Sequence, residues 1–193
     1  MGVSGPRRGG VLVSIGLILT VMPTAHAEPA TQRDFWSAAA RDATATIYAP
    51  SAASLRALGF TAGSVSFASL KLTMVCRDEW NVDANYGDEG SRSLELYQAT
   101  RDCSPDQGDF DTPQNRSTVK VAGATVEIVY HGCRDSGPQD LPEDACPATR
   151  RIYSAYGTLP AIRDKKPSFL QLDALGLSRV EVRSVLRSLR PAG

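Results

Sequence analysis

The sequence has little lysine and histidine, and no long apolar run follows its first 27 residues. Only four of its 21 basic residues are lysines, and its histidines are His26 and His131. With one histidine left beyond residue 27, a two-imidazole metal site is excluded. Neither C-x-x-C nor G-x-S-x-G occurs, so we expect no zinc site of that kind and no serine-hydrolase elbow. Without a second apolar run of about 20 residues, no membrane span is expected in the mature chain.

Charges of both signs balance over the 193 residues, with 21 basic and 21 acidic side chains. A content of 42 % hydrophobic and 22 % charged residues is typical of a globular domain. Beyond residue 27 there remain 19 basic and 21 acidic residues, a formal charge of −2. A nearly neutral chain lacks the positive potential that attracts phosphates, so no nucleic-acid partner is expected.

Residues 1–27 have the pattern of a signal peptide. Arg7 and Arg8 precede the apolar run Val11–Met22, which is shorter than the about 20 residues needed to cross a bilayer. Ala25-His26-Ala27 fits a small-x-small cleavage site, and an uncleaved anchor is the alternative. We therefore expect cleavage before Glu28 and a secreted, periplasmic or envelope location.

All four cysteines follow the expected cleavage site. An even number of cysteines in an exported chain indicates disulfides, and four cysteines allow three pairings. We expect Cys76–Cys103 and Cys133–Cys146, because each pair closes a local loop. Each such bridge stabilises the fold by roughly 3 kcal/mol.

Residues 28–43 form an alanine-rich lead-in with a short helix expected over 35–40, and residues 44–190 form one domain. Alternation of apolar and polar residues in this domain is typical of strands that bury one face. Strands are expected over 44–48, 70–76, 94–97, 118–121, 124–130, 152–159 and 168–172, and a short helix over 51–58. Asp83–Gly90 is expected to be a polar turn, and Ala122-Gly123 a tight hairpin turn, because glycine adopts positive φ.

The clearest local pattern is a C-terminal helix. Ser178 and Glu181 have the spacing of a capping box, and Leu177 can pack on Val182. An apolar stripe follows at helical spacing: Val182, Val185, Leu186 and Leu189. Basic residues in the expected last turn and a proline predict its end: Arg187, Arg190 and Pro191. The stripe must be buried, and the sheet is the surface available for it.

Few side chains stand out as candidates for binding. A basic stripe at helical spacing comprises Arg179, Arg183, Arg187 and Arg190. Its first three residues are candidates to contact an acidic partner or anionic head groups, and a solvated helix face is the alternative. Tyr97 could line a ligand surface, although aromatic side chains are more often core residues. His131 is the one imidazole available, and a structural role is the alternative.

The polar segment 83–90 also invites a calcium hypothesis. Four side chains in it could supply oxygen ligands: Asp83, Asn85, Asp88 and Glu89. The register of an EF-hand fails, because Asp88 and Leu94 stand where glycine and the bidentate glutamate are required. A solvated turn is therefore expected, with no metal and no other cofactor.

Several short patterns occur in an order that resembles a known family. They are Tyr48-Ala-Pro50, Leu96–Gln98, Val119–Gly123 and Gly176–Glu181. Over residues 44–190 the chain resembles domains of unknown function found in exported bacterial proteins and beside anti-sigma-factor segments. The resemblance implies an α+β fold, with a curved antiparallel sheet of about six to seven strands packed against a C-terminal helix. It implies sensing or binding in the envelope and brings no catalytic residues.

Three functional hypotheses follow. The favoured one is a non-enzymatic, disulfide-stabilised binding or sensing module whose partner is an unknown envelope protein or ligand. The second is a secreted hydrolase with an unrecognised site built from a carboxylate or His131. The third is a secreted inhibitor or effector that presents the loop 133–146, which departs from the pattern of the family.

Overall fold

A computed structural model describes six ranges of the chain: 32–60, 65–68, 81–88, 92–100, 115–134 and 141–192. The expected strand 70–76 and the expected Cys76–Cys103 pair lie outside the described residues. Within them, no helix is both long and apolar enough to cross a membrane.

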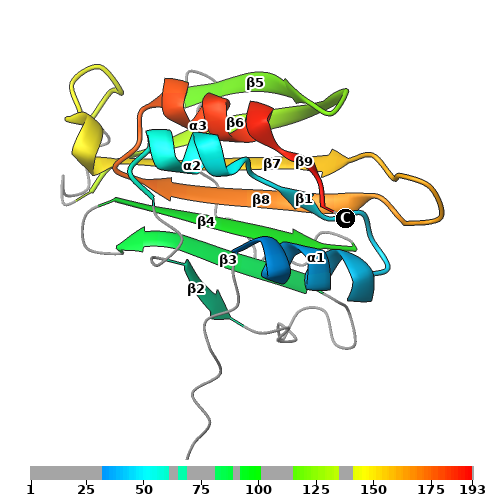
Figure 1. Ribbon diagram of the computed structural model, residues 1–193. Helices are drawn as coiled ribbons and strands as arrows, with labels where there is room; N and C mark the ends of the chain where they lie inside the picture. The colour runs from blue at the N-terminus through cyan, green and yellow to red at the C-terminus, as the bar shows by residue number, and fades with distance from the viewer. Residues whose placement is uncertain are drawn as a thin grey trace, which may run out of the picture.

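A seven-stranded antiparallel sheet is the centre of the fold (Figure 1). Its strands lie in the order β2-β3-β4-β8-β7-β6-β5, and a two-stranded sheet pairs β1 with β9. The strands are β1 (Tyr48–Ala49), β2 (Val65–Ala68), β3 (Asn81–Asp88), β4 (Arg92–Ala99), β5 (Arg116–Val121), β6 (Ala124–Cys133), β7 (Arg151–Leu159), β8 (Ser168–Leu175) and β9 (Arg190–Pro191). The expected α+β class is confirmed.

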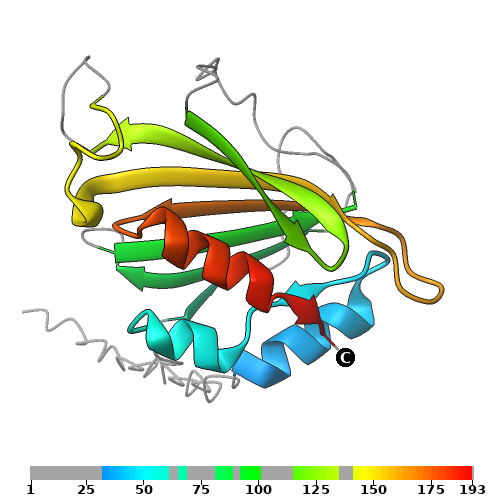
Figure 2. The same ribbon diagram turned by 90° about the horizontal axis from the view of Figure 1, so that it is seen from above.

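Three helices of the described part of the chain cover one face of this sheet (Figure 2). They are α1 (Gln32–Asp42), α2 (Ala52–Ala57) and α3 (Arg179–Ser188). The core lies between the helices and the sheet, and strict alternation on β8 shows how the sequence produces it. Ser168, Leu170, Leu172 and Ala174 are buried toward the helices, while Phe169, Gln171, Asp173 and Leu175 between them are half-buried on the other face.

The prediction of a polar turn at Asp83–Gly90 is wrong, because Asn81–Asp88 form β3. Val82, Ala84 and Tyr86 are buried in the core at every second position. The strand pairs with β2 on one side and β4 on the other. Pairing on both edges satisfies the backbone and overrides the turn preference of the intervening Asp and Asn.

Helix α3 begins as predicted. The Ser178 Oγ accepts a hydrogen bond from the Glu181 backbone N–H, and the Glu181 carboxylate accepts one of 2.7 Å from the Ser178 backbone N–H. The four apolar stripe residues are buried in the core: Val182, Val185, Leu186 and Leu189. An ion pair from Arg92 on β4 to Glu181 ties the start of the helix to the sheet.

The end of α3 differs from the prediction. The helix ends at Ser188, and Arg190 belongs to β9, so it is not in the last helical turn. Its guanidinium nevertheless donates hydrogen bonds to the carbonyl groups of Arg187 and Leu189. Arg190 therefore satisfies helix-terminal carbonyl groups from outside the helix, where the dipole favours a cation.

The prediction of a strand over 44–48 is wrong for residues 44–47, because β1 begins at Tyr48 and Ala45 forms only an isolated bridge with Lys166. A buried glutamine holds β1. The Gln98 side chain on β4 donates to the Tyr48 carbonyl over 2.7 Å and accepts from the Tyr48 backbone N–H over 2.8 Å. Two of the patterns that carry the family resemblance thus meet in space, although they lie 50 residues apart in the sequence.

Candidate functional site

The face of the sheet opposite the helices carries a row of polar side chains. We call it the distal face and define it by Asp83, Tyr97, Gln171, Tyr156, Asn85, Glu95, Asp173, Ser154 and His131. Strand register places Asp83 beside Tyr97 and Gln171, and Asn85 beside Glu95 and Asp173, across β3, β4 and β8. These positions alternate with core residues, so the pleat brings them onto one surface, and His131 lies where the register of β6 shifts between Tyr130 and Gly132.

The carboxylate of Asp173 interacts with several neighbouring side chains on the distal face. It accepts hydrogen bonds from the Ser154 hydroxyl and, over 2.6 Å, from the Gln171 amide. Burial lowers the pKa of His131, and the negative charge of Asp173 offsets part of that shift. Burial likewise raises the pKa of Asp83, a hydrogen bond from Asn85 lowers it, and the Asp173 charge raises it further.

Ser154, His131 and Asp173 are the residue types of a catalytic triad, yet their connections do not fit one. In a triad, the serine donates its proton to the imidazole, and the carboxylate orients that imidazole. Here the Ser154 hydroxyl donates directly to Asp173. Because a hydroxyl has one proton to donate, this bond leaves Ser154 no proton to donate to the imidazole, and the relay of a triad is not formed. The arrangement gives the hydrolase hypothesis no support.

A second cluster lies where the described part of the disulfide loop contacts α3. We call residues 141–150 the stapled segment, because Cys146 in it is bonded to Cys133 at the end of β6, as predicted. The Tyr130 hydroxyl donates to the Leu141 carbonyl over 3.0 Å, and Arg151 Nε donates to the Cys146 carbonyl over 2.9 Å. The segment is therefore held at both ends by the strands beneath it.

Glu143 joins the stapled segment to α3. It accepts a hydrogen bond of 2.6 Å from the Tyr153 hydroxyl and forms an ion pair with Arg179. The Arg179 guanidinium lies over the Tyr153 ring, 5.7 Å from the ring centre. Burial alone would raise the pKa of Glu143, but the hydrogen bonds from Tyr153 and Arg179 and the nearby positive charges lower it below its usual value.

The five residues predicted to bind a partner do not form one site. Arg179, Arg183 and Arg187 lie on α3, while Tyr97 and His131 lie on the distal face. Arg179 is engaged by Glu143, Arg183 is half-buried, and Arg187 is exposed. Their roles in binding stay predictions, and the structure separates them into two groups on opposite sides of the sheet.

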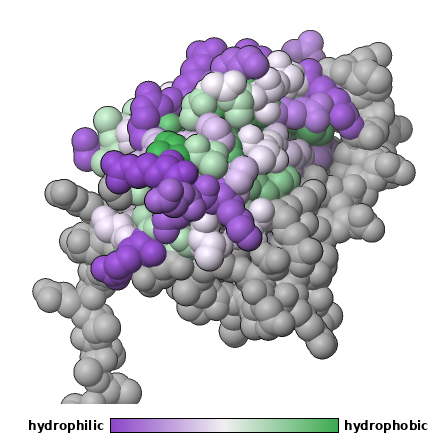
Figure 3. All heavy atoms as spheres, turned by 90° about the vertical axis from the view of Figure 1, so that its right-hand side faces the viewer, coloured by the Kyte–Doolittle hydropathy of each residue, from purple (hydrophilic) through white to green (hydrophobic). Residues whose placement is uncertain are grey.

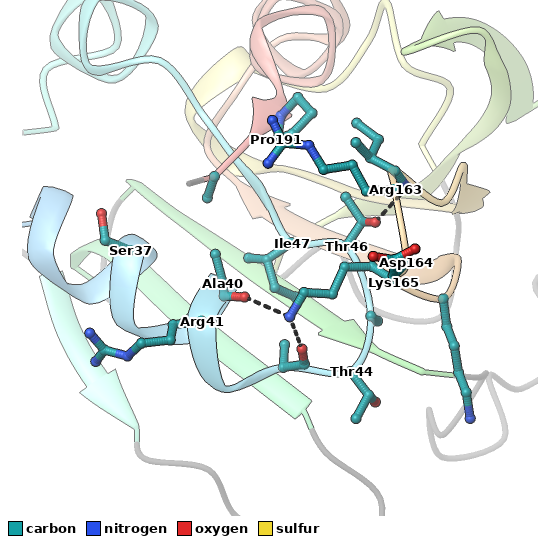
Figure 4. A pocket seen from close by; sticks show the side chains of 15 residues that line it. Ser37, Ala40, Arg41, Thr44, Thr46, Ile47, Arg163, Asp164, Lys165 and Pro191 are labelled. Carbon is teal, nitrogen blue, oxygen red and sulfur yellow. Dashed lines mark hydrogen bonds between the residues drawn. The ribbon is translucent and has the colours of Figure 1, made fainter.

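A cavity of about 920 Å³ is present at the other end of the strands (Figure 4). We call it the α1 cavity; its walls are α1, the segment 43–47, the loop 162–166 between β7 and β8, and the C-terminal residues 191–192. The Lys165 ammonium donates to the carbonyl groups of Ala40, over 3.1 Å, and of Ala43. These bonds occupy carbonyl groups at the end of α1 that lack helical partners.

Reasoning from the sequence missed the α1 cavity. Its one local signal is the charged run Arg163–Lys166 between two expected strands, beside the exposed Ile162. The periodicity of apolar residues cannot predict such a cavity, because its walls come from segments more than 100 residues apart in the sequence. Within the described residues, no group of three or more His, Cys, Asp or Glu side chains is placed to hold a metal ion.

The fold and the two clusters define an α+β domain with a sheet covered on one face by helices and a loop closed by a disulfide. Comparisons with protein-family models, with curated proteins and with solved structures find no match to this chain.

Proposed function

We propose that the protein is an exported, non-enzymatic binding module of the bacterial envelope, which contacts a partner protein through the stapled segment and the exposed face of α3. The observation that carries the proposal is the Cys133–Cys146 bridge together with the Glu143–Arg179 ion pair. Disulfides persist in oxidising compartments, which supports export. A segment fixed before binding loses less conformational entropy when a partner arrives.

The chemistry of this surface also suits a protein partner. Leu141 is 38 % exposed and Val180, in the first turn of α3, is 76 % exposed, and exposed aliphatic side chains serve as contact points. Arg187 is exposed and has no ion pair with another described residue. An apolar contact beside a cation favours a partner with a complementary acidic rim.

The experiment is capture from an envelope extract by the immobilised protein, with variants Val180→Asp and Arg187→Glu. Both positions are exposed, so neither change should unfold the domain. We expect one retained protein that is lost with both variants and kept with the control Arg56→Glu on α2. Failure to retain any protein, or equal retention by Val180→Asp, would contradict the proposal.

The inhibitor or effector hypothesis uses the same stapled segment, and the closed loop favours it equally. It differs in the partner, which would be an enzyme whose activity falls on binding. Replacing both Cys133 and Cys146 by Ser should then abolish inhibition of the captured enzyme while circular dichroism still reports the sheet. An enzyme that keeps full activity in the complex would leave only the binding-module function.

A further inference from the structure

We propose that the α1 cavity binds an amphipathic anion, a small molecule with a carboxylate or phosphate head group on an apolar body. This inference is independent of the protein-binding surface, since the stapled segment and the α1 cavity lie at opposite ends of the long strands (Figure 1). The cavity volume, about 920 Å³, lies within the range of roughly 300–1,000 Å³ typical of small-molecule sites.

The charge of the cavity wall selects an anion. Among the described residues that line the cavity, four are cationic, Arg41, Arg163, Lys165 and Lys166, and Asp164 supplies the single carboxylate. Arg163 and Lys165 have no ion pair with another described residue. A concave surface with an excess of positive charge concentrates anions.

Lys165 has the geometry to bind a head group. In Figure 4 its side chain crosses from the loop 162–166 toward α1, where the ammonium meets the backbone. An ammonium has three donors, and two of them are taken by the carbonyl groups of Ala40 and Ala43. One donor is left for a ligand, and a charge-assisted hydrogen bond to a carboxylate or phosphate is among the strong ones.

The rest of the lining is mostly apolar. Ile47, Ile162, Pro191 and several alanines contribute to it. Ile162 is 37 % exposed and is one of three large hydrophobic side chains exposed among the described residues. Figure 3 views the molecule from this side and shows apolar surface directly beside strongly hydrophilic side chains. Apolar walls next to cations match a ligand that has both characters.

The site is formed before any ligand binds. Lys166 N–H donates to the Thr44 carbonyl, and Thr46 N–H donates to the Lys166 carbonyl, both over 2.9 Å. The Ile162 N–H donates to the Thr46 hydroxyl over 2.9 Å, and Ala192 N–H donates to the Ile47 carbonyl over 2.8 Å. These bonds fix three of the walls to one another, which reduces the entropy lost on binding.

The test is titration calorimetry of the purified, oxidised protein with dodecanoate and dodecyl phosphate, each below its micelle concentration, and with uncharged dodecanol below its solubility limit. We expect one molecule of an anion to bind per chain and dodecanol to bind at least about tenfold more weakly. Shortening the alkyl chain of the carboxylate ligand should weaken its binding by up to about fourfold for each methylene removed. The preferred head group distinguishes a carboxylate ligand from a phosphate ligand, and either preference supports the site.

Two variants locate the binding. Arg163→Asn removes a charge at a position with φ of 55°, a conformation that asparagine tolerates, so the loop should keep its shape. Lys165→Met removes the ammonium, and Arg163→Asn remains decisive if this variant fails to fold. We expect each folded variant to bind the anion at least about tenfold more weakly and the control Arg56→Gln to bind normally. Absence of saturable binding, equal binding of dodecanol, or undiminished binding by Arg163→Asn would overturn the proposal.

Discussion

At the scale of single residues, a few polar groups with two or more partners determine the local structure. Gln98 forms two hydrogen bonds with the Tyr48 backbone. Asp173 accepts hydrogen bonds from Ser154 and Gln171 on the distal face. Glu143, in the stapled segment, accepts a hydrogen bond from Tyr153 and forms an ion pair with Arg179. Each of these groups is at least partly buried, so removing one leaves its partners without hydrogen bonds and costs more than the bond itself.

Glu143→Gln is expected to lower the free energy of unfolding by about 1–3 kcal/mol near neutral pH, since it removes a charge that accepts two hydrogen bonds. The pKa of Glu143 is lowered in the folded state, so its stabilising effect is complete above the usual glutamate pKa of about 4.3. The effect disappears as the pH falls through the lower folded-state pKa. Urea unfolding of both proteins from pH 7 to pH 3 measures this.

The difference in stability between wild type and Glu143→Gln should thus narrow below about pH 4. Glu127→Gln serves as the control, because the Arg116–Glu127 pair is exposed and such pairs contribute about 0–1 kcal/mol. A difference for Glu143→Gln that grows as the pH falls would contradict the assigned ion pair.

At the scale of elements, the turns and helix ends decide where the strands stop. Gly87 and Gly123 both adopt left-handed conformations, with φ of 86° and 87°. The two differ in their surroundings: a Cβ at Gly123 would meet open space, whereas one at Gly87 would overlap the Arg92 carbonyl oxygen and lie 2.6 Å from a Phe60 ring carbon. They form a matched pair that separates backbone strain from steric overlap.

Gly123→Ala is expected to destabilise the protein by about 1–2 kcal/mol through backbone strain alone. Gly87→Ala should lower the free energy of unfolding by roughly a further 1–3 kcal/mol, because the backbone of β4 must shift to admit the methyl group. Thermal or urea unfolding of the two variants measures the difference. Equal stability of the two variants would show that Gly87 is not in close contact with Arg92.

At the scale of the whole molecule, one sheet organises two separate surfaces. Helix α3 packs its apolar stripe on the sheet while its first turn holds the stapled segment. At the opposite end, β1 pairs with β9, and α1 forms one wall of the α1 cavity. A change that loosens one end need not loosen the other, because the core lies between them.

Replacing Cys133 and Cys146 together by Ser should lower the free energy of unfolding by roughly 3 kcal/mol, as expected for a bridge over 13 residues. We expect the far-ultraviolet circular dichroism spectrum and binding at the α1 cavity to persist, since neither depends on the stapled segment. Urea unfolding and dodecanoate titration of the double variant measure both. Loss of the sheet signal in the double variant would mean that the bridge is required for folding.

Much of this fold could be predicted from local patterns. The capping box at Ser178 and Glu181, the hairpin turn at Ala122-Gly123 and the Cys133–Cys146 bridge are all confirmed. The segment Asp83–Gly90 was wrongly predicted, because turn-forming residues are tolerated in a strand that is paired on both edges. The α1 cavity could not be predicted, since no single segment contains its pattern.

What the sequence determines by itself is therefore what acts over a few neighbouring residues: strand alternation, helix caps, glycine turns and a local disulfide. The tertiary structure alone decided which polar residues meet. Gln98 reaches Tyr48, Glu143 reaches Arg179, and Lys165 reaches the end of α1. These contacts join residues between 36 and 125 positions apart in the sequence. They form only when folding brings distant segments together, which costs conformational entropy, so no local pattern in the sequence predicts them.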